Sequence, residues 1–270
     1  MKKRFKLGVI GCGVTARAIL KGVVLSDFLH EKKIIVSDGN EENLHKINRL
    51  GVQTTDNNRY VAENCEFLLL AVKQKDFAEA AANLKCCSHE KVISVVGGYT
   101  KNAIKKHFGS GAVKVARCIP NLPCVIGSGA IGVDMSDFNN SPADTEFISN
   151  VFNCLGAVLS IDESKLDAVT GISGCGPAYV FMFLDGLIDA GVKRGLTKNE
   201  AKILAVQTLL GAAEMAQSDE YSVAELLMQS CGKGEASIDA VKILEERNFR
   251  GILDDAVGAC VKRTEEITVK

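Results

Sequence analysis

The sequence predicts an α/β protein in which a mainly parallel sheet comes first and an all-helical domain follows. Three observations predict this. Short segments rich in Val and Ile alternate with helical patterns over residues 1–161, a glycine-rich loop joins the first such segment to the first helical pattern, and only helical patterns follow residue 162. Continuous apolar strands separated by helices are typical of a parallel sheet covered on both faces. We therefore predict two domains, residues 1–161 and residues 162–270.

The predicted strands of the first domain are short apolar runs bounded by turn residues. In chain order they are KLGVIG, KIIVSD, EFLLLAV, KVISVV, VKVARC, GAIGVD and GAVLSID. The helices predicted between them cover residues 15–26, 41–50, 77–84, 102–107 and 143–152.

The second domain is predicted to contain five helices, at residues 176–194, 197–217, 223–229, 236–246 and 249–266. Thr197 and Glu200 form a capping-box pattern at the start of one of them, and Gly195 stands where the preceding helix would end. The apolar faces of these helices need a partner surface, and two copies of such a bundle would supply it. We therefore expect a homodimer at least.

Composition excludes several classes of function. The hydrophobic fraction of 47% and the charged fraction of 24% are those of an ordinary globular protein, and the net charge of −1 gives no field that favours nucleic acid or a membrane surface. We expect no apolar stretch long enough to cross a bilayer and no export signal, and therefore a cytoplasmic protein. The ten cysteines have no metal-ligand spacing and are expected to be reduced thiols, with no metal site.

The first glycine loop carries a dinucleotide-binding pattern. Gly11, Cys12, Gly13, Val14, Thr15 and Ala16 form Gly-x-Gly-x-x-Ala directly after a predicted strand and at the start of a helix. The glycines allow a tight turn and close approach of a pyrophosphate, and the helix N-terminus favours its negative charge. This context indicates a Rossmann-type domain, although a tight turn without a ligand is the alternative.

Asp38 ends the second predicted strand, 25 positions after Gly13. An acidic residue near this spacing binds the ribose hydroxyls of the adenosine in such folds. The carboxylate would repel the 2′-phosphate of NADPH, and no arginine follows Asp38 to bind that phosphate. The sequence therefore favours NADH as the cofactor. The alternative is that Asp38 only caps the turn that follows.

A second glycine loop, GISGCGPAYVF, covers residues 171–181. At this loop the chain resembles the pyrroline-5-carboxylate reductases. The resemblance runs along the whole chain, through GVIGCGVTARAI, LAVK, GGYT, RCIPNLP, SGCGPAY and LGAA. It implies a Rossmann domain joined to a helical dimerisation domain, NADPH or NADH as cofactor, and reduction of 1-pyrroline-5-carboxylate to L-proline. It also implies a homodimer and allows a larger ring of dimers.

The resemblance implies further site residues. Cofactor contacts extend from Gly11, Cys12, Gly13, Val14 and Thr15 to Asp38, Asn58, Val72, Lys73 and Gly97. Gly174 and Gly176 would allow close backbone approach near the reactive end of the cofactor, and Cys175 stands where the family usually has serine. For Cys175 and Tyr179, a packing role without ligand contact is the alternative, as an ordinary solvated lysine is for Lys73.

The substrate clamp is the place where the chain departs from the family pattern. A gap-free match puts GKGEAS, residues 232–237, on the family's Ser-Pro-Gly-Gly-Thr-Thr, so that Gly232, Lys233 and Glu235 replace family residues. The resemblance implies that Ala236 and Ser237 bind the substrate carboxylate, with Ser237 as the catalytic hydroxyl. Glu220 matches a position near the substrate, with an exposed surface glutamate as the alternative.

Three functions remain open at this point. The first is pyrroline-5-carboxylate reduction with a modified clamp. The second is reduction of a different cyclic imine, because Lys233 and Glu235 alter the charge of the clamp. The third is a paralogue that binds nucleotide without catalysis. The 3-hydroxyacid dehydrogenases share the glycine-loop start, but no lysine follows the second glycine loop within the next turns, so we discount them.

Overall fold

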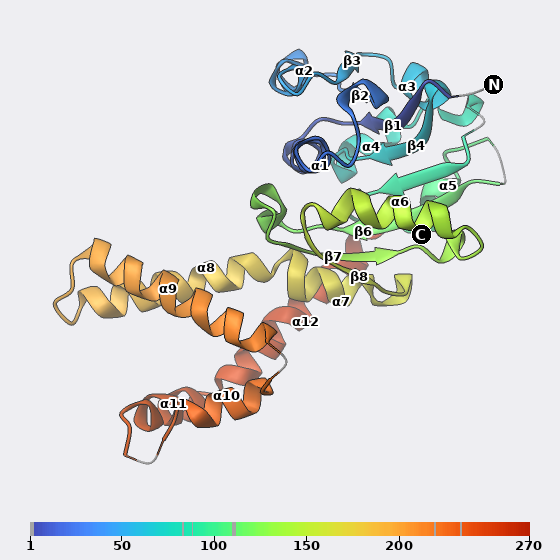
Figure 1. Ribbon diagram of the computed structural model, residues 1–270. Coiled ribbons are helices and arrows are strands. Elements are labelled where there is room, and N and C mark those ends of the chain that lie inside the picture. Colours follow the sequence, from blue (N-terminus) through green and yellow to red (C-terminus); the bar gives the residue numbers. More distant parts are fainter. Residues whose placement is uncertain (1–2, 83, 88, 110–111, 219, 233) are drawn as a thin grey trace. The chain divides into compact units, whose positions relative to one another are not determined.

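The computed structural model describes residues 3–82, 84–87, 89–109, 112–218, 220–232 and 234–270 (Figure 1). Its contacts divide the chain into two compact units. Unit 1 comprises Met1–Cys175 and Cys260–Lys270, and unit 2 comprises Gly176–Ala259.

Unit 1 is built on one sheet of eight strands in the order β3-β2-β1-β4-β5-β6-β7-β8. All neighbouring pairs are parallel except β6 and β7. The strands are β1 (Phe5–Ile10), β2 (Ile34–Ser37), β3 (Gln53–Thr55), β4 (Cys65–Leu70), β5 (Lys91–Ser94), β6 (Lys114–Ile119), β7 (Gly129–Asp134) and β8 (Gly156–Ser160). The strand order reverses between β1 and β4, and ligands bind at such switch points in open parallel sheets.

Helices pack on both faces of this sheet, as predicted. They are α1 (Val14–Leu25), α2 (Glu41–Asn48), α3 (Asn58–Asn64), α4 (Phe77–Ala80), α5 (Lys101–Lys105), α6 (Pro142–Asn153) and α7 (Leu166–Val169). Alternate residues of β4 show the two faces. Phe67 and Leu69 belong to the core cluster that includes α1 and α6, whereas Leu68 and Leu70 belong to the cluster that includes α3 and α4.

The sequence-based prediction missed one strand, β3, and two helices, α3 and α7. β3 has only three residues, Gln-Thr-Thr, all half-buried, so it has no apolar run to detect. Helix α3 is capped by Asn57, whose side chain accepts a hydrogen bond from the backbone N–H of Tyr60. Only Val61 and Ala62 of α3 are buried, which is too few for a recognisable helical period.

A buried ionic cluster fixes α5 against the end of β7. The Lys101 ammonium lies 2.5 Å from Asp134 Oδ1 and 2.5 Å from Ser136 Oγ, and the second carboxylate oxygen of Asp134 accepts the Glu163 N–H at 2.7 Å. Burial alone would raise the pKa of Asp134, but the hydrogen bonds from Lys101 and Ser136 outweigh it, so the pKa lies below its ordinary value. The charge pair therefore stabilises the folded state while Asp134 is ionised.

Unit 2 consists of helices only within its described residues, as predicted. They are α8 (Gly176–Val192), α9 (Lys198–Gln217), α10 (Val223–Gln229), α11 (Ser237–Glu246) and the first part of α12 (Phe249–Ile267). The predicted capping box is present, because Thr197 Oγ1 accepts from the Glu200 N–H while Glu200 accepts from the Thr197 N–H. Ser222 and Glu225 form a second capping box at α10.

The contacts divide the chain at a different point from the predicted boundary at residues 161 and 162. Helix α7 packs against β7, and the backbone of Val269 exchanges hydrogen bonds with Gly98 and Thr100. These contacts attach residues 162–175 and 260–270 to the sheet, although both segments follow the last strand. The functional division at residue 161 stays a prediction.

One helical stretch is longer and more apolar than the sequence reading allowed. Glu163–Val192 is a continuous run of 30 helical residues that is long and apolar enough to cross a membrane, by length and composition alone. The prediction that no stretch reaches this length is therefore wrong. It overlooked α7 and the π-helical turn Thr170–Gly174, which precede α8 with only Cys175 between them.

Candidate functional site

The loop between β1 and α1 has the geometry that its glycines predict. Gly11 has φ +94°, and a Cβ there would lie 2.7 Å from the Ala71 carbonyl oxygen, so only glycine fits. A Cβ on Gly13 would meet nothing within 4 Å, and Gly13 is the N-cap of α1 without a side-chain cap. The first turn of α1 therefore offers backbone N–H groups beside open space, which fits a phosphate group.

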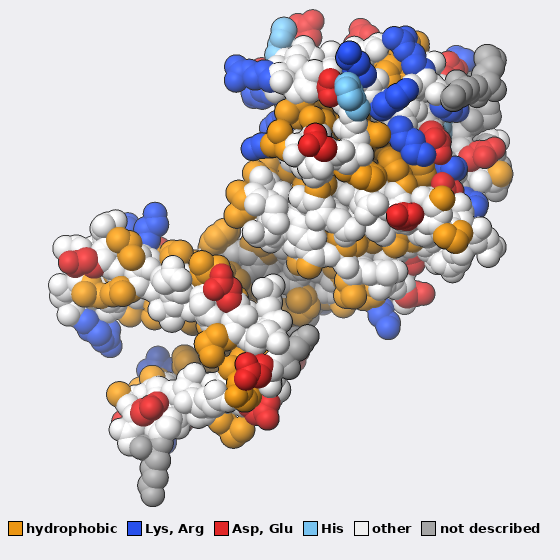
Figure 2. All heavy atoms as spheres, viewed as in Figure 1, with side chains coloured by type: hydrophobic (Ala, Val, Ile, Leu, Met, Phe, Trp, Pro, Cys, Tyr) orange, Lys and Arg blue, Asp and Glu red, His pale blue; other side chains and the backbone are white. Residues whose placement is uncertain are grey.

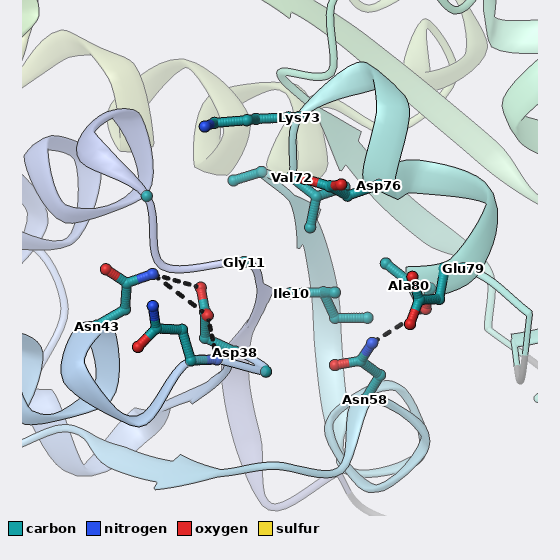
Figure 3. A pocket seen from close by; sticks show the side chains of 14 residues that line it. Ile10, Gly11, Asp38, Asn43, Asn58, Val72, Lys73, Asp76, Glu79 and Ala80 are labelled. Atoms are coloured by element: carbon teal, nitrogen blue, oxygen red, sulfur yellow. Dashed lines mark hydrogen bonds between the residues drawn. The ribbon is translucent and has the colours of Figure 1, made fainter.

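A cavity of about 560 Å³ lies beside this loop, at the ends of β1, β2 and β4 (Figure 3). The predicted residues that line it are Gly11, Gly13, Asp38, Asn58, Val72 and Lys73. It occupies the place where the strand order reverses, and we call it pocket 1.

Asp38 is held at the wall of pocket 1 by several donors. Its Oδ2 accepts the Cys12 N–H at 2.6 Å, its Oδ1 accepts the Asn40 N–H at 2.8 Å, and the Asn43 amide lies at 3.3 and 3.4 Å (Figure 3). Arg17 donates to the Cys12 carbonyl at 2.7 Å and to Asn43 Oδ1 at 3.1 Å. The Asp38 carboxylate is thus an oriented hydrogen-bond acceptor, whereas Arg17 already donates to other groups of the protein.

The side chains of two residues that were predicted to contact the cofactor, Cys12 and Asn58, contact other parts of the protein instead. Cys12 is fully buried and lines neither cavity, and burial, followed by the charge of Asp38, raises the pKa of its thiol to about 11. Asn58 lines pocket 1, but its Oδ1 accepts from Ser37 Oγ at 2.7 Å and its Nδ2 donates to the Ala80 carbonyl at 3.0 Å. Cys12 therefore supports Asp38, and Asn58 ties β2 and α3 to α4.

A second cavity of about 430 Å³, pocket 2, adjoins pocket 1. The two share Gly13, Ala71, Val72 and Lys73. Three residues predicted to contact the cofactor line pocket 2: Val14 and Thr15 of the first glycine loop, and Gly97, which was expected beside the nicotinamide. Because the two cavities meet at the N-terminus of α1, together they fit an elongated dinucleotide with its pyrophosphate at the junction.

Pocket 2 also contains residues that the sequence analysis did not single out, among them Arg117, Thr170 and Thr264. Arg117 is 3% exposed and forms ion pairs with Glu163 at 3.4 Å and Asp167 at 3.8 Å. Its buried Nε has no hydrogen-bond partner among the described residues. The signal was a lone arginine, Arg117, inside the apolar part of β6, between Ala116 and Cys118. Thr170 and Thr264 carried no comparable signal.

The predicted substrate residues belong to unit 2. Ser237 begins α11, and its Oγ is buried without a hydrogen-bond partner among the described residues. The N-cap of α11, Ala236, provides no side-chain cap. Glu235 turns back on its own loop, where its Oε2 accepts the Gly232 N–H at 3.1 Å. The clamp therefore keeps an unused hydroxyl beside an uncapped helix start, which suits an anion.

Two further residues of the predicted substrate site, Glu220 and Lys233, have no described contact that supports a role in binding substrate. Glu220 is exposed in the connection between α9 and α10. Lys233 lies outside the described residues. The predicted cofactor residues lie in unit 1 and the predicted substrate residues lie in unit 2.

The sheet, the uncapped glycine loop and the oriented carboxylate together define an oxidoreductase that uses a nicotinamide dinucleotide. Comparisons with known proteins agree for both parts of the chain. Residues 6–98 match the family model described as NADP oxidoreductase coenzyme F420-dependent, and residues 163–267 match the one described as pyrroline-5-carboxylate reductase dimerisation.

Full-length relatives narrow the class to one family. Human pyrroline-5-carboxylate reductase 2 is 34% identical over 97% of this chain and 83% of its own, and the Synechocystis pyrroline-5-carboxylate reductase is 33% identical over 98% and 99%. The structure of the Coxiella burnetii reductase aligns with a TM-score of 0.90 at 31% identity, covering 99% of this chain and all of that one. The Plasmodium falciparum enzyme, solved with NADP bound, aligns over the full length of both chains with a TM-score of 0.86 at 27% identity. The chain belongs to the pyrroline-5-carboxylate reductase family.

Proposed function

We propose that this protein reduces 1-pyrroline-5-carboxylate to L-proline with NAD(P)H, in proline biosynthesis. Similarity to pyrroline-5-carboxylate reductases over 97% of the chain or more supports this activity. The observation that carries it is the buried, unpartnered hydroxyl of Ser237 at the uncapped start of α11, because the substrate is a small carboxylate.

In this proposal, the chain's own residues bind and orient the two reactants. The N–H groups of the first turn of α1 bind the pyrophosphate, Asp38 accepts hydrogen bonds from the adenosine ribose, and Gly97 leaves room beside the nicotinamide ring. When bound, the dihydronicotinamide supplies the hydride that the C=N carbon receives. Ser237 Oγ and the N–H groups of Ala236 and Ser237 hold the carboxylate of the imine.

We further propose a preference for NADH. The carboxylate of Asp38 is fixed where a 2′-phosphate would lie, and like charges at short distance disfavour binding. One guanidinium nitrogen of Arg17 already donates to the Cys12 carbonyl and to Asn43 Oδ1, so it is not available to donate to a phosphate. The Plasmodium falciparum relative was solved with NADP, so the preference is a property we assign to Asp38 of this chain.

A homodimer is the proposed assembly, and a larger ring of dimers remains compatible with it. Within the described part of unit 2, Ala201 and Ala205 are the only buried hydrophobic residues, whereas large side chains such as Met182 (81% exposed) and Val223 (71%) are uncovered. Figure 2 shows hydrophobic side chains spread over the helices of unit 2. A unit without a core of its own needs a second copy to bury its apolar surface.

The same argument applies to the long apolar run Glu163–Val192. Asp185 and Asp189 lie within α8, and buried carboxylates are costly in lipid. This segment falls in the region that matches the dimerisation model, so we assign its uncovered face to a partner subunit. A cytoplasmic location is proposed on the same basis and on the nine described cysteines, which are all free thiols.

The test is a steady-state assay of the purified protein with 1-pyrroline-5-carboxylate and each dinucleotide, with L-proline measured as product. The six-membered cyclic imine acid serves as the competing substrate. Turnover with only the larger ring would support the different-imine alternative. Dinucleotide binding without turnover of either imine would support the non-catalytic paralogue.

A further inference from the structure

Two cysteine side chains meet in unit 1, although they are far apart in the sequence. Cys175 directly follows the π-helical turn Thr170–Gly174, and Cys260 lies in α12. The Cys260 thiol donates to Cys175 Sγ with the two sulfur atoms 3.0 Å apart. Both residues are half-buried, so small reagents have access to them. A disulfide has its sulfur atoms about 2.05 Å apart, so a bond requires a closure of roughly 1 Å.

The position of the pair in the chain is distinctive. Cys175 is the last residue of unit 1 before the chain enters unit 2, and Cys260 is the first residue after it returns. The segment between them, Gly176–Ala259, is the whole of unit 2. A bond between the two sulfur atoms would therefore close unit 2 into one covalent loop and fix together the two points where the chain leaves and re-enters unit 1.

Each cysteine is also linked to the wall of pocket 2 by one hydrogen bond. The Cys175 N–H donates to the Thr170 carbonyl at 2.8 Å, and Thr264 Oγ1 donates to the Cys260 carbonyl at 2.9 Å. Thr170 and Thr264 both line pocket 2. The thiol pair thus joins two segments that each contribute a threonine to the wall of this cavity.

We propose that Cys175 and Cys260 form a redox-active dithiol, which low-molecular-weight disulfides convert to an intrachain disulfide and thiol reductants restore. One cysteine thiolate attacks a sulfur atom of glutathione disulfide, and the S–S bond of the reagent breaks to release one glutathione. The second cysteine then attacks the protein sulfur of this mixed disulfide and releases the second glutathione. The two cysteines lose two electrons and two protons, and the glutathione disulfide gains them as two thiols.

The reaction should depend on pH in a defined direction. The two thiols share one hydrogen bond and either can donate it; with Cys175 as the donor, this bond to Cys260, followed by burial, raises the pKa of the Cys175 thiol to about 11, so Cys175 is protonated near neutral pH. Since the thiolate is the attacking species, the rate of cross-linking rises with pH across the neutral to alkaline range.

The experiment exposes the full reduced chain to glutathione disulfide, alkylates the remaining thiols, and maps disulfide-linked peptides by mass spectrometry. We expect a link between the peptides of Cys175 and Cys260, a faster-migrating band on a non-reducing gel, and reversal of both by dithiothreitol. Cys175→Ser and Cys260→Ser should each abolish the link, whereas Cys231→Ser, at a half-buried thiol of unit 2, should retain it.

Three results would overturn the proposal. Both cysteines could stay fully alkylated after exposure to the oxidant, they could end as stable mixed disulfides with glutathione, or the link could join two chains rather than one. Mapping of the unmodified chain needs no variant, so the result does not depend on how the serine variants fold.

Discussion

Replacing Ser237 with alanine separates substrate binding from stability more sharply than any other change in this chain. The hydroxyl is buried and has no partner among the described residues, so its removal takes away no hydrogen bond within the folded chain. We therefore expect the free energy of unfolding to stay within about 0.5 kcal/mol of the wild type, or to rise. A hydrogen bond to a substrate carboxylate contributes about 1.5–3 kcal/mol, which corresponds to a loss of roughly 10- to 100-fold in kcat/KM.

The assay combines steady-state kinetics at varied 1-pyrroline-5-carboxylate with urea unfolding of the same preparations. Thr197→Ala is the matched control, because Thr197 caps α9 through a complete capping box. It should lose about 1 kcal/mol of stability and keep its kcat/KM. The reasoning is refuted if Ser237→Ala keeps kcat/KM within about twofold of the wild type, or if it loses as much stability as the Thr197 variant.

Four further changes test the cofactor site and the sheet. Asp38→Asn keeps an acceptor for the Cys12 N–H but removes the charge, so the ratio of kcat/KM for NADPH to that for NADH should rise about tenfold or more, and an unchanged ratio would contradict the assigned preference. Gly13→Ala should weaken dinucleotide binding about tenfold in a fluorescence titration. Its free energy of unfolding should stay unchanged, because the added Cβ meets nothing within 4 Å. Gly11→Ala, at a residue with φ +94°, should instead lose about 2 kcal/mol of stability in urea unfolding. Lys101→Met should cost about 3 kcal/mol by leaving Asp134 buried without its cation. The folded pKa of Asp134 lies below its unfolded value, so the wild type keeps this stability above about pH 4 and loses it as the pH falls through the folded pKa. The Lys101 variant should lack this acid-dependent loss of stability. Unfolding curves of both proteins from about pH 3 to 7 measure the difference, and identical pH profiles would count against the pairing.

Much of the fold could be predicted because its signals are local. The apolar strands and the glycine loop at Gly11 and Gly13 depend on periodicity and on backbone geometry, and both are legible in the sequence. β3 escaped because three polar residues pair with β2 through backbone bonds alone, which any side chains allow. The helical turn Thr170–Gly174 was not predicted, because glycines such as Gly171 and Gly174 normally indicate the end of a helix.

The site was predictable to the extent that it depends on motif positions. Asp38 and Gly97 line the cavities as the pattern indicates, but Cys12 does not, because its side chain packs in the core and only its N–H serves the site. Thr264 reaches pocket 2 only because the chain returns to the sheet after unit 2. Contacts of this kind join residues far apart in sequence, and no local pattern encodes them.

That return has a consequence for how the protein is made. Gln74 donates to the Ile267 carbonyl at 2.6 Å, and both residues line pocket 2. During synthesis residues 1–175 emerge before residues 260–270, so the sheet is made while pocket 2 still lacks the part of its wall that Thr264 and Ile267 supply. Cleavage within α12 ahead of Thr264 would take that part of the wall away and leave the lining of pocket 1 intact.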